Sequence, residues 1–121
     1  DGTDATIIAT GVTVSEALKA QKELENENIK VRVIDIHTIK PLDEELIVKA
    51  AKETKKLITV EDHSVIGGLG SAVADLLAIK YPKKLTKLGI NDEFGKSGKW
   101  NELMDYYKIT AKYIVDEVKK N

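Results

Sequence analysis

The sequence predicts an α/β domain, a three-layer α/β/α sandwich built around a mostly parallel sheet of about five strands. Short β-branched apolar runs alternate with amphipathic helical segments along most of the chain. This alternation favours parallel strands with right-handed crossovers, because each helix returns the chain across one face of the sheet. The chain has 121 residues, of which 42% are hydrophobic, and both figures fit one domain with one core.

The first half of the chain supplies two predicted strands and two predicted helices. Residues 5–10 and 31–36 are short β-branched runs that are typical of strands. Apolar positions at helical spacing between them predict a helix with Ser15 as its N-cap and Asn28 as its stop. Asp43 is the expected N-cap of the next helix. The face of that helix expected to be buried comprises Leu46, Ile47, Ala50 and Ala51.

The second half of the chain continues the alternation. Residues 57–60 and 85–90 are the third and fourth predicted strands, and a helix is predicted between them over 71–80. Two shorter helical segments are predicted over 100–107 and 110–120. The side chains expected to face inward are Val73, Leu76, Leu77 and Ile79 in the helix over 71–80, and Ile114, Val115 and Val118 in the last segment.

Residues 1–4 fall outside this pattern, and we expect them to be a linker remnant of a preceding domain, with residues 5–121 forming a single domain. Nineteen basic and twenty acidic residues leave a net charge of −1, so no global field attracts nucleic acid or an anionic membrane. The chain has no cysteine and no apolar run near the roughly 20 residues that span a bilayer. We therefore expect a cytoplasmic domain that binds neither nucleic acid nor membrane.

A glycine-rich segment lies between the third predicted strand and the following helix, with Gly67, Gly68, Gly70 and Ser71 as its candidate residues. Backbone amides at such a helix N-terminus can bind a phosphate. The spacing, however, matches neither the GxGxxG dinucleotide motif nor the GxxxxGK[ST] phosphate loop. The glycines therefore favour close packing of the helix against the sheet or another subunit, and an anion site is the alternative.

Polar residues end the third predicted strand, namely Glu61, Asp62, His63 and Ser64. This edge is where open α/β sheets usually place function, and a Glu, an Asp and a His can perform acid–base chemistry. Neighbouring strand residues point to opposite faces, so these side chains converge only if the strand bends. We expect them to form interface or loop-fixing hydrogen bonds, with a catalytic or ligand-binding role as the alternative. His37 also lies at a predicted strand end, and we expect it to be a packed or surface residue, with a contact to a ligand as the alternative.

The sequence shows no complete catalytic or metal-binding pattern. The two histidines are far apart and lack the spaced carboxylates that a metal ion needs. Ser64, Ser71 and Ser97 are nucleophiles by residue type alone, because no GxSxG motif surrounds them. We therefore predict no catalytic, cofactor-binding or metal-binding residue in this chain.

Three segments resemble, in order and at the usual separations, the C-terminal domain of transketolase. They are VIDIHTIKPLD at 33–43, ITVEDHSVIGGLGSAVADLLA at 58–78 and LGINDEFGKSGKWNELMDYYKIT at 88–110. Deoxyxylulose-phosphate synthases and the β subunits of 2-oxo acid dehydrogenases have a similar domain. The stretches HSVIGGLGSAVA and DEFGKSG are more similar to transketolase than to either, whereas Lys99-Trp100-Asn101 departs from the family pattern.

The resemblance implies a specific role for the chain. Transketolases transfer a two-carbon ketol unit between sugar phosphates with thiamine diphosphate and Mg²⁺, which bind between a pyrophosphate-binding and a pyrimidine-binding domain at a dimer interface. The third domain supplies no established catalytic residue. We therefore expect a support and dimer-assembly domain that is inactive alone and whose partners are those two domains in a homodimer. A dehydrogenase β subunit, a deoxyxylulose-phosphate synthase and a regulatory anion-binding module are the alternatives.

Overall fold

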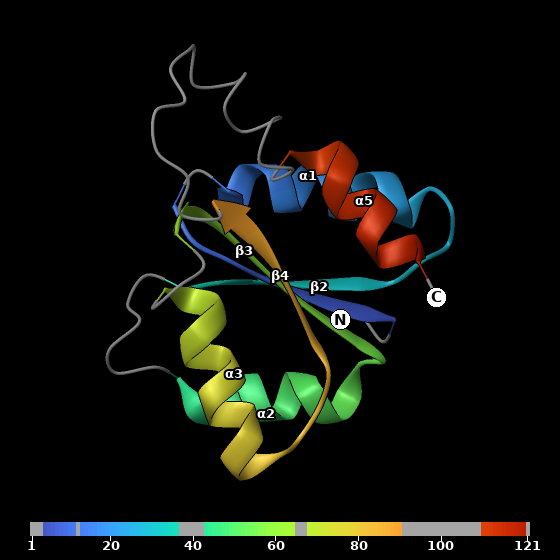
Figure 1. The fold of residues 1–121 in the computed structure, drawn as a ribbon. Coiled ribbons are helices and arrows are strands. Elements are labelled where there is room, and N and C mark those ends of the chain that lie inside the picture. The colour runs from blue at the N-terminus through green and yellow to red at the C-terminus, as the bar shows by residue number, and fades with distance from the viewer. Residues whose placement is uncertain (1–3, 12, 37–42, 65–67, 91–109, 121) are drawn as a thin grey trace.

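The computed structural model describes residues 4–11, 13–36, 43–64, 68–90 and 110–120. Strands and helices alternate through these ranges, as the sequence predicts (Figure 1). The elements in chain order are β1 (Ala5–Ala9), α1 (Thr13–Glu25), β2 (Val31–Asp35), α2 (Glu44–Glu53), β3 (Lys56–Ser64), α3 (Leu69–Lys80), β4 (Leu85–Ile90) and α5 (Ala111–Lys119). The helix predicted over 100–107 lies outside the described residues.

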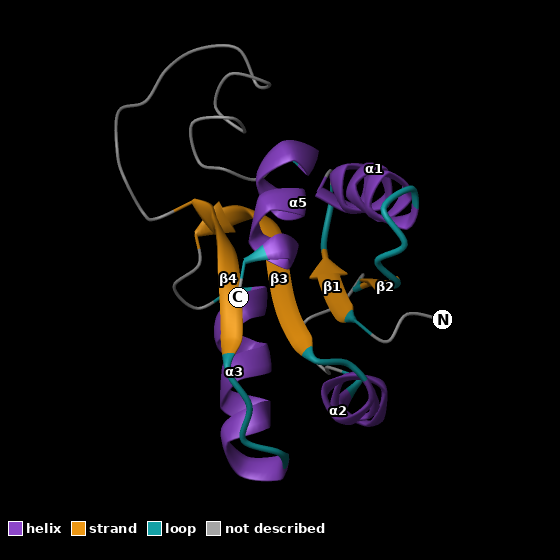
Figure 2. Cartoon of the chain, turned by 90° about the vertical axis from the view of Figure 1, so that its right-hand side faces the viewer, coloured by secondary structure: helices purple, strands orange, loops and turns teal. Residues whose placement is uncertain are grey.

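The sheet is parallel, with strand order β2-β1-β3-β4. Helices α1 and α5 cover one face and α2 and α3 cover the other (Figures 1 and 2). The predicted three-layer α/β fold is therefore confirmed. The sheet has four strands in the ranges that the structure describes, where about five were expected. None of the helices in these ranges is long and apolar enough to cross a membrane.

The core consists of two clusters, one on each face of the sheet. Ile7 of β1 and Ile58 of β3 pack with Ile114 of α5 on one face. Ile8 and Leu57, their neighbours in the strands, pack with the buried residues of α2 and α3 on the other face. Successive strand residues point to opposite faces, so a strand covered on both sides needs an unbroken apolar run. All five residues of β1 are accordingly buried.

Helix α1 begins at Thr13, so the prediction of Ser15 as its N-cap is wrong. The Thr13 hydroxyl donates to the carbonyl oxygen of Val60 at 2.9 Å and accepts from the amide of Thr10 at 3.2 Å. These contacts fix the helix start against β3 and against the residue that follows β1. The contact with Val60 could not be predicted from local sequence spacing. The predicted stop is confirmed, because Asn28 has the left-handed φ of 62° that ends the helical turn.

Four other sequence expectations require correction. Leu46 is 37% exposed and Ile79 is 80% exposed, although both were expected to face inward. Ile79 lies two residues after the buried Leu77, about 200° further around the helix, and therefore points away from the sheet. Strand β3 continues to Ser64, four residues beyond its expected end, and α3 begins at Leu69 rather than at residue 71.

Replacing Asp43 with alanine should destabilise the protein by about 1 kcal/mol, because the side chain is the N-cap of α2. Its Oδ1 accepts from the amide of Leu46 at 3.2 Å, as the sequence predicts. The change in unfolding free energy can be measured by urea denaturation. Asp75→Ala is the matched control, because Asp75 is exposed in the interior of α3 and should tolerate alanine. Equal losses in both variants would contradict the capping role.

Candidate functional site at the β3–α3 junction

The candidate residues lie on both sides of the connection between β3 and α3. This connection follows the carboxyl end of β3, a strand flanked on both sides in the sheet by β1 and β4. Glu61 is in β3, Gly68 is the N-cap of α3, and Gly70 and Ser71 lie in its first turn. Outside the described part of the structure are Gly67, His37, Ser97 and the side chains of Asp62, His63 and Ser64.

The Glu61 side chain is fully buried and caps α3 from the neighbouring strand. Its Oε1 accepts from the amide of Leu69 at 2.9 Å, and its Oε2 accepts from the amide of Gly70 at 2.8 Å. These amides belong to the first turn of α3, where N–H groups have no partner within the helix and the helix dipole favours a negative charge. Gly68, the N-cap residue, has no side chain with which to satisfy them. The carboxylate of Glu61 therefore takes the place of a local cap.

Strand β3 is irregular where its polar residues begin. From the sequence, these residues were expected to converge only if the strand bends. β3 pairs regularly with β4 up to Val60, which is opposite Leu88, and pairing resumes at Ser64, opposite Ile90. Four residues of β3 therefore cover the same distance as two residues of β4. Such an irregularity kinks a strand and re-aims the side chains that follow it. Glu61 immediately follows the last regular pair and reaches across to α3.

Gly70 lies in the first turn of α3, close to β3 and β4. A Cβ atom at this position would lie 2.6 Å from Cδ of Lys87 in β4 and 3.0 Å from Oγ1 of Thr59 in β3. Both distances are too short for an ordinary contact between atoms. The missing side chain of Gly70 therefore allows the first turn of α3 to pack on β3 and β4, while the Glu61 carboxylate binds the same turn through its amides.

The Glu61 carboxylate already occupies the amides at the junction that could otherwise bind an anion. An external anion could bind the amides of Leu69 and Gly70 only by displacing the Glu61 carboxylate, which is already negative and buried. No three Asp, Glu or His side chains come close enough together to hold a metal ion in the ranges described. The arrangement therefore holds a helix on a sheet. Glu61 was among the candidate residues predicted from the sequence, but its role as the cap of α3 was not predicted. The sequence feature that could have indicated this role is a glutamate in a buried strand followed by a glycine at the start of the next helix.

Comparison with known proteins gives consistent matches over nearly the whole chain. Residues 1–114 match the family model for the transketolase C-terminal domain. A protein of Methanocaldococcus jannaschii described as a transketolase C-terminal section is 50% identical over 125 residues, which cover 99% of this chain and 39% of that protein. The solved structure of a split gene transketolase, described as an inactive beta4 tetramer, superposes with a TM-score of 0.92 at 46% identity, covering 98% of this chain and 39% of that one.

A deoxyxylulose-phosphate synthase gives a similar but shorter match. The 1-deoxy-D-xylulose-5-phosphate synthase of Heliobacterium modesticaldum is 40% identical over 114 residues, which cover 93% of this chain and 18% of that enzyme. The chain thus spans 39% or less of the length of these relatives. It is similar to one part of each of them.

Proposed function

The chain belongs to the transketolase C-terminal domain family, and from this premise we propose that it is the support and assembly domain of a transketolase. The parent enzyme transfers a two-carbon ketol unit between sugar phosphates. Two facts support this proposal: the relatives that match the whole chain are transketolase sections or chains, and they extend well beyond the matched part.

The β3–α3 junction is the observation that carries the support role. The carboxyl edge of a parallel sheet is where α/β enzymes usually bind ligands, but here its buried charge and its helix N-terminus satisfy each other. Fixing α3 in this way gives the edge a defined shape, which a packing surface requires. We propose that Asp62, His63, Ser64 and Gly67, with Ser71, face the pyrimidine-binding domain or the second subunit, whereas Gly68 is buried within this chain.

The residues of the β3–α3 junction do not fit thiamine diphosphate, and the described carboxylates do not fit Mg²⁺. A diphosphate needs backbone or side-chain donors that are not already engaged, and the two α3 amides are bound to Glu61. Mg²⁺ needs several oxygen ligands in one place, and the ranges that the structure covers offer no such group of carboxylates. We propose that both cofactors bind to the pyrophosphate-binding and pyrimidine-binding domains of the parent enzyme.

We also propose that the parent is a homodimer in the cytoplasm. The support for the homodimer is the family resemblance, in which the cofactors lie at a dimer interface. The support for the cytoplasm is the cysteine-free sequence, which suits a reducing compartment. Sedimentation of the reconstituted enzyme tests the first statement.

The isolated chain should show no ketol transfer, whereas adding it to the polypeptide that carries the remaining domains should give an active enzyme. The assay supplies a ketose phosphate donor, an aldose phosphate acceptor, thiamine diphosphate and Mg²⁺, and detects the new sugar phosphate. Heat-denatured chain is the control for the added protein. Turnover by the chain alone, or full activity of the remaining domains without it, would contradict the support role.

The second candidate is the corresponding domain of a deoxyxylulose-phosphate synthase, which the match to the Heliobacterium modesticaldum enzyme favours. The same reconstituted enzyme distinguishes the two candidates. Formation of 1-deoxy-D-xylulose 5-phosphate in place of ketol transfer would favour the synthase. The anion-binding alternative requires displacement of Glu61, and the dehydrogenase alternative requires capture of a peripheral-subunit-binding region in a pull-down.

A further inference from the structure

All three Lys-Lys pairs of the sequence meet at the edge of the sheet opposite to the β3–α3 junction. Lys55 and Lys56 lie at the start of β3, Lys83 and Lys84 precede β4, and Lys119 and Lys120 lie at the end of α5. Figure 2 shows the molecule from this side. The six lysines line one groove of about 1020 Å³, which we call the triple-lysine groove.

The triple-lysine groove concentrates positive charge in a chain whose net charge is −1. Six lysines line it, against two carboxylates, Asp4 and Glu117. Like charges gathered in this way repel one another, so the cluster needs a physical cause. Part of the cause is that helices which return along a parallel sheet end at this edge, and their C-termini favour cations.

Two of the lysines serve that structural role. The Lys56 ammonium donates to the main-chain oxygens of Glu117 and Lys120 at the end of α5. The Lys83 ammonium donates to the main-chain oxygen of Thr54, the C-cap of α2, at 2.8 Å. These two side chains therefore stabilise helix ends, and they leave the other four lysines to be explained.

Three of the remaining lysines are exposed and weakly paired around the groove, namely Lys55, Lys84 and Lys120. Lys55 is 84% exposed, and its closest acidic oxygen, from Asp4, is 4.0 Å away. Lys84 is exposed and forms no ion pair with any described residue. Lys120 is 68% exposed and lies 3.3 Å from Glu117. Lys119 is the exception, because its ammonium lies 2.6 Å from a carboxylate oxygen of Glu27, and this hydrogen bond raises the pKa of Lys119. The rim of the groove is thus cationic and accessible.

The apolar floor of the triple-lysine groove and its ammonium donors indicate which ligands it can bind. Ile29 and Val118, which are both half-buried, contribute apolar surface between the lysines. Arg32, the only arginine of the chain, does not line the groove, so the planar two-point donors that suit phosphate are missing. Separate ammonium groups around an apolar floor suit carboxylates spaced along a polypeptide better than one compact phosphate.

We propose that the triple-lysine groove docks an acidic, partly apolar segment of a partner polypeptide. The carboxylates of this segment pair with Lys55 and Lys84, and its apolar side chains lie over Ile29 and Val118. The proposal rests on the charge and shape of the groove, and it holds whether or not the chain supports a transketolase.

The test measures binding of a fluorescein-labelled synthetic peptide of alternating Glu and Leu by fluorescence anisotropy. The unmodified chain should bind it, and raising the salt concentration should weaken binding. The double variant Lys55→Glu/Lys84→Glu should weaken binding about tenfold or more, because each reversal replaces an attraction with a repulsion. Both side chains are exposed, so circular dichroism should show an unchanged fold.

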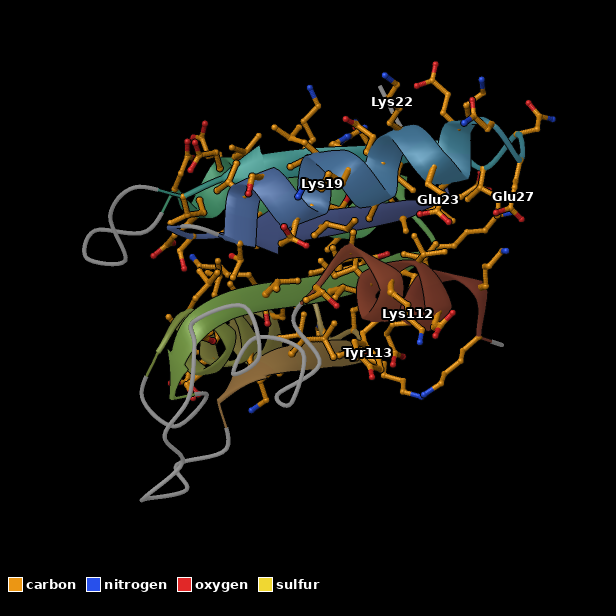
Figure 3. All side chains as sticks on the ribbon, turned by 90° about the horizontal axis from the view of Figure 1, so that it is seen from above. Lys19, Lys22, Glu23, Glu27, Lys112 and Tyr113 are labelled. Carbon is orange, nitrogen blue, oxygen red and sulfur yellow. The ribbon has the colours of Figure 1, made fainter. Side chains whose placement is uncertain are left out.

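The matched control is Lys22→Glu/Lys112→Glu, which changes the net charge equally. Lys22 lies on α1 and Lys112 on α5 (Figure 3). Neither residue lines the groove. The control should stay within about twofold of the unmodified chain, since long-range charge effects are screened. Equal weakening in both double variants would overturn the proposal, because binding would then follow net charge alone.

Two further probes separate the peptide from other ligands. A peptide of alternating Glu and Ser should bind more weakly than the Glu and Leu peptide, and equal binding would overturn the role of the apolar floor. Tripolyphosphate should compete only at concentrations well above those of the peptide. Tighter binding of tripolyphosphate than of peptide, or no binding of the peptide at all, would overturn the assignment of an acidic polypeptide partner.

Discussion

Replacing Glu61 with glutamine should lower the free energy of unfolding by about 2–4 kcal/mol. The carboxylate is fully buried and accepts from two amides of α3, those of Leu69 and Gly70. A glutamine of the same size offers one oxygen and one NH₂ group, so it satisfies one amide and presents a donor to the other. Losing a charged acceptor and leaving a buried N–H unpaired both cost stability. Urea denaturation followed by circular dichroism measures the change.

Glu44→Gln provides the matched control for this prediction. Glu44 is an exposed glutamate in the first turn of α2, so the same chemical change there should cost less than about 0.5 kcal/mol. Amide hydrogen exchange gives a second readout, because exchange at Leu69 and Gly70 should become faster in Glu61→Gln and not in Glu44→Gln. If the two variants have the same stability and the same exchange, Glu61 does not cap α3.

Strands and helix caps that depend on neighbouring residues could be predicted closely from the sequence. Strand β4 has the predicted bounds, and β1 and β2 end one residue earlier than predicted. Their β-branched apolar runs carry the necessary information, because strands covered on both faces need apolar residues on both faces. The cap of α2 was also predictable, since Asp43 binds an amide only three residues away.

Features whose cause lies far along the chain could not be predicted. The start of α1 depends on a hydrogen bond from Thr13 to Val60, 47 residues away. The irregular pairing of β3 depends on its register with β4, which no local pattern specifies. The three lysine pairs are plain in the sequence, yet their convergence follows from the parallel sheet and the position of α5. Tertiary contacts decided each of these cases.

The sequence predicted that Glu61 lies near the start of α3, but it did not predict the contact between them. Of the candidates that the structure describes, Glu61, Gly68 and Gly70 lie at the same edge, as chain order in a parallel sheet requires. Glu61 binds the amides of α3 because β3 becomes irregular immediately after Val60. The glycine spacing also left close packing and anion binding open, and the geometry at Gly70 favours packing.

Replacing Gly70 with valine should destabilise the protein by about 2–3 kcal/mol, because the new Cβ atom meets Lys87 at 2.6 Å and Thr59 at 3.0 Å. Ala78→Val is the control, since Ala78 is exposed on the same helix and reports the helix propensity of valine alone. A double-mutant cycle with Lys87→Ala then isolates the clash. Removing the Lys87 stem should recover part of the loss in Gly70→Val and nothing in Ala78→Val. If Gly70→Val costs no more than Ala78→Val, close approach to the sheet is not why residue 70 is glycine.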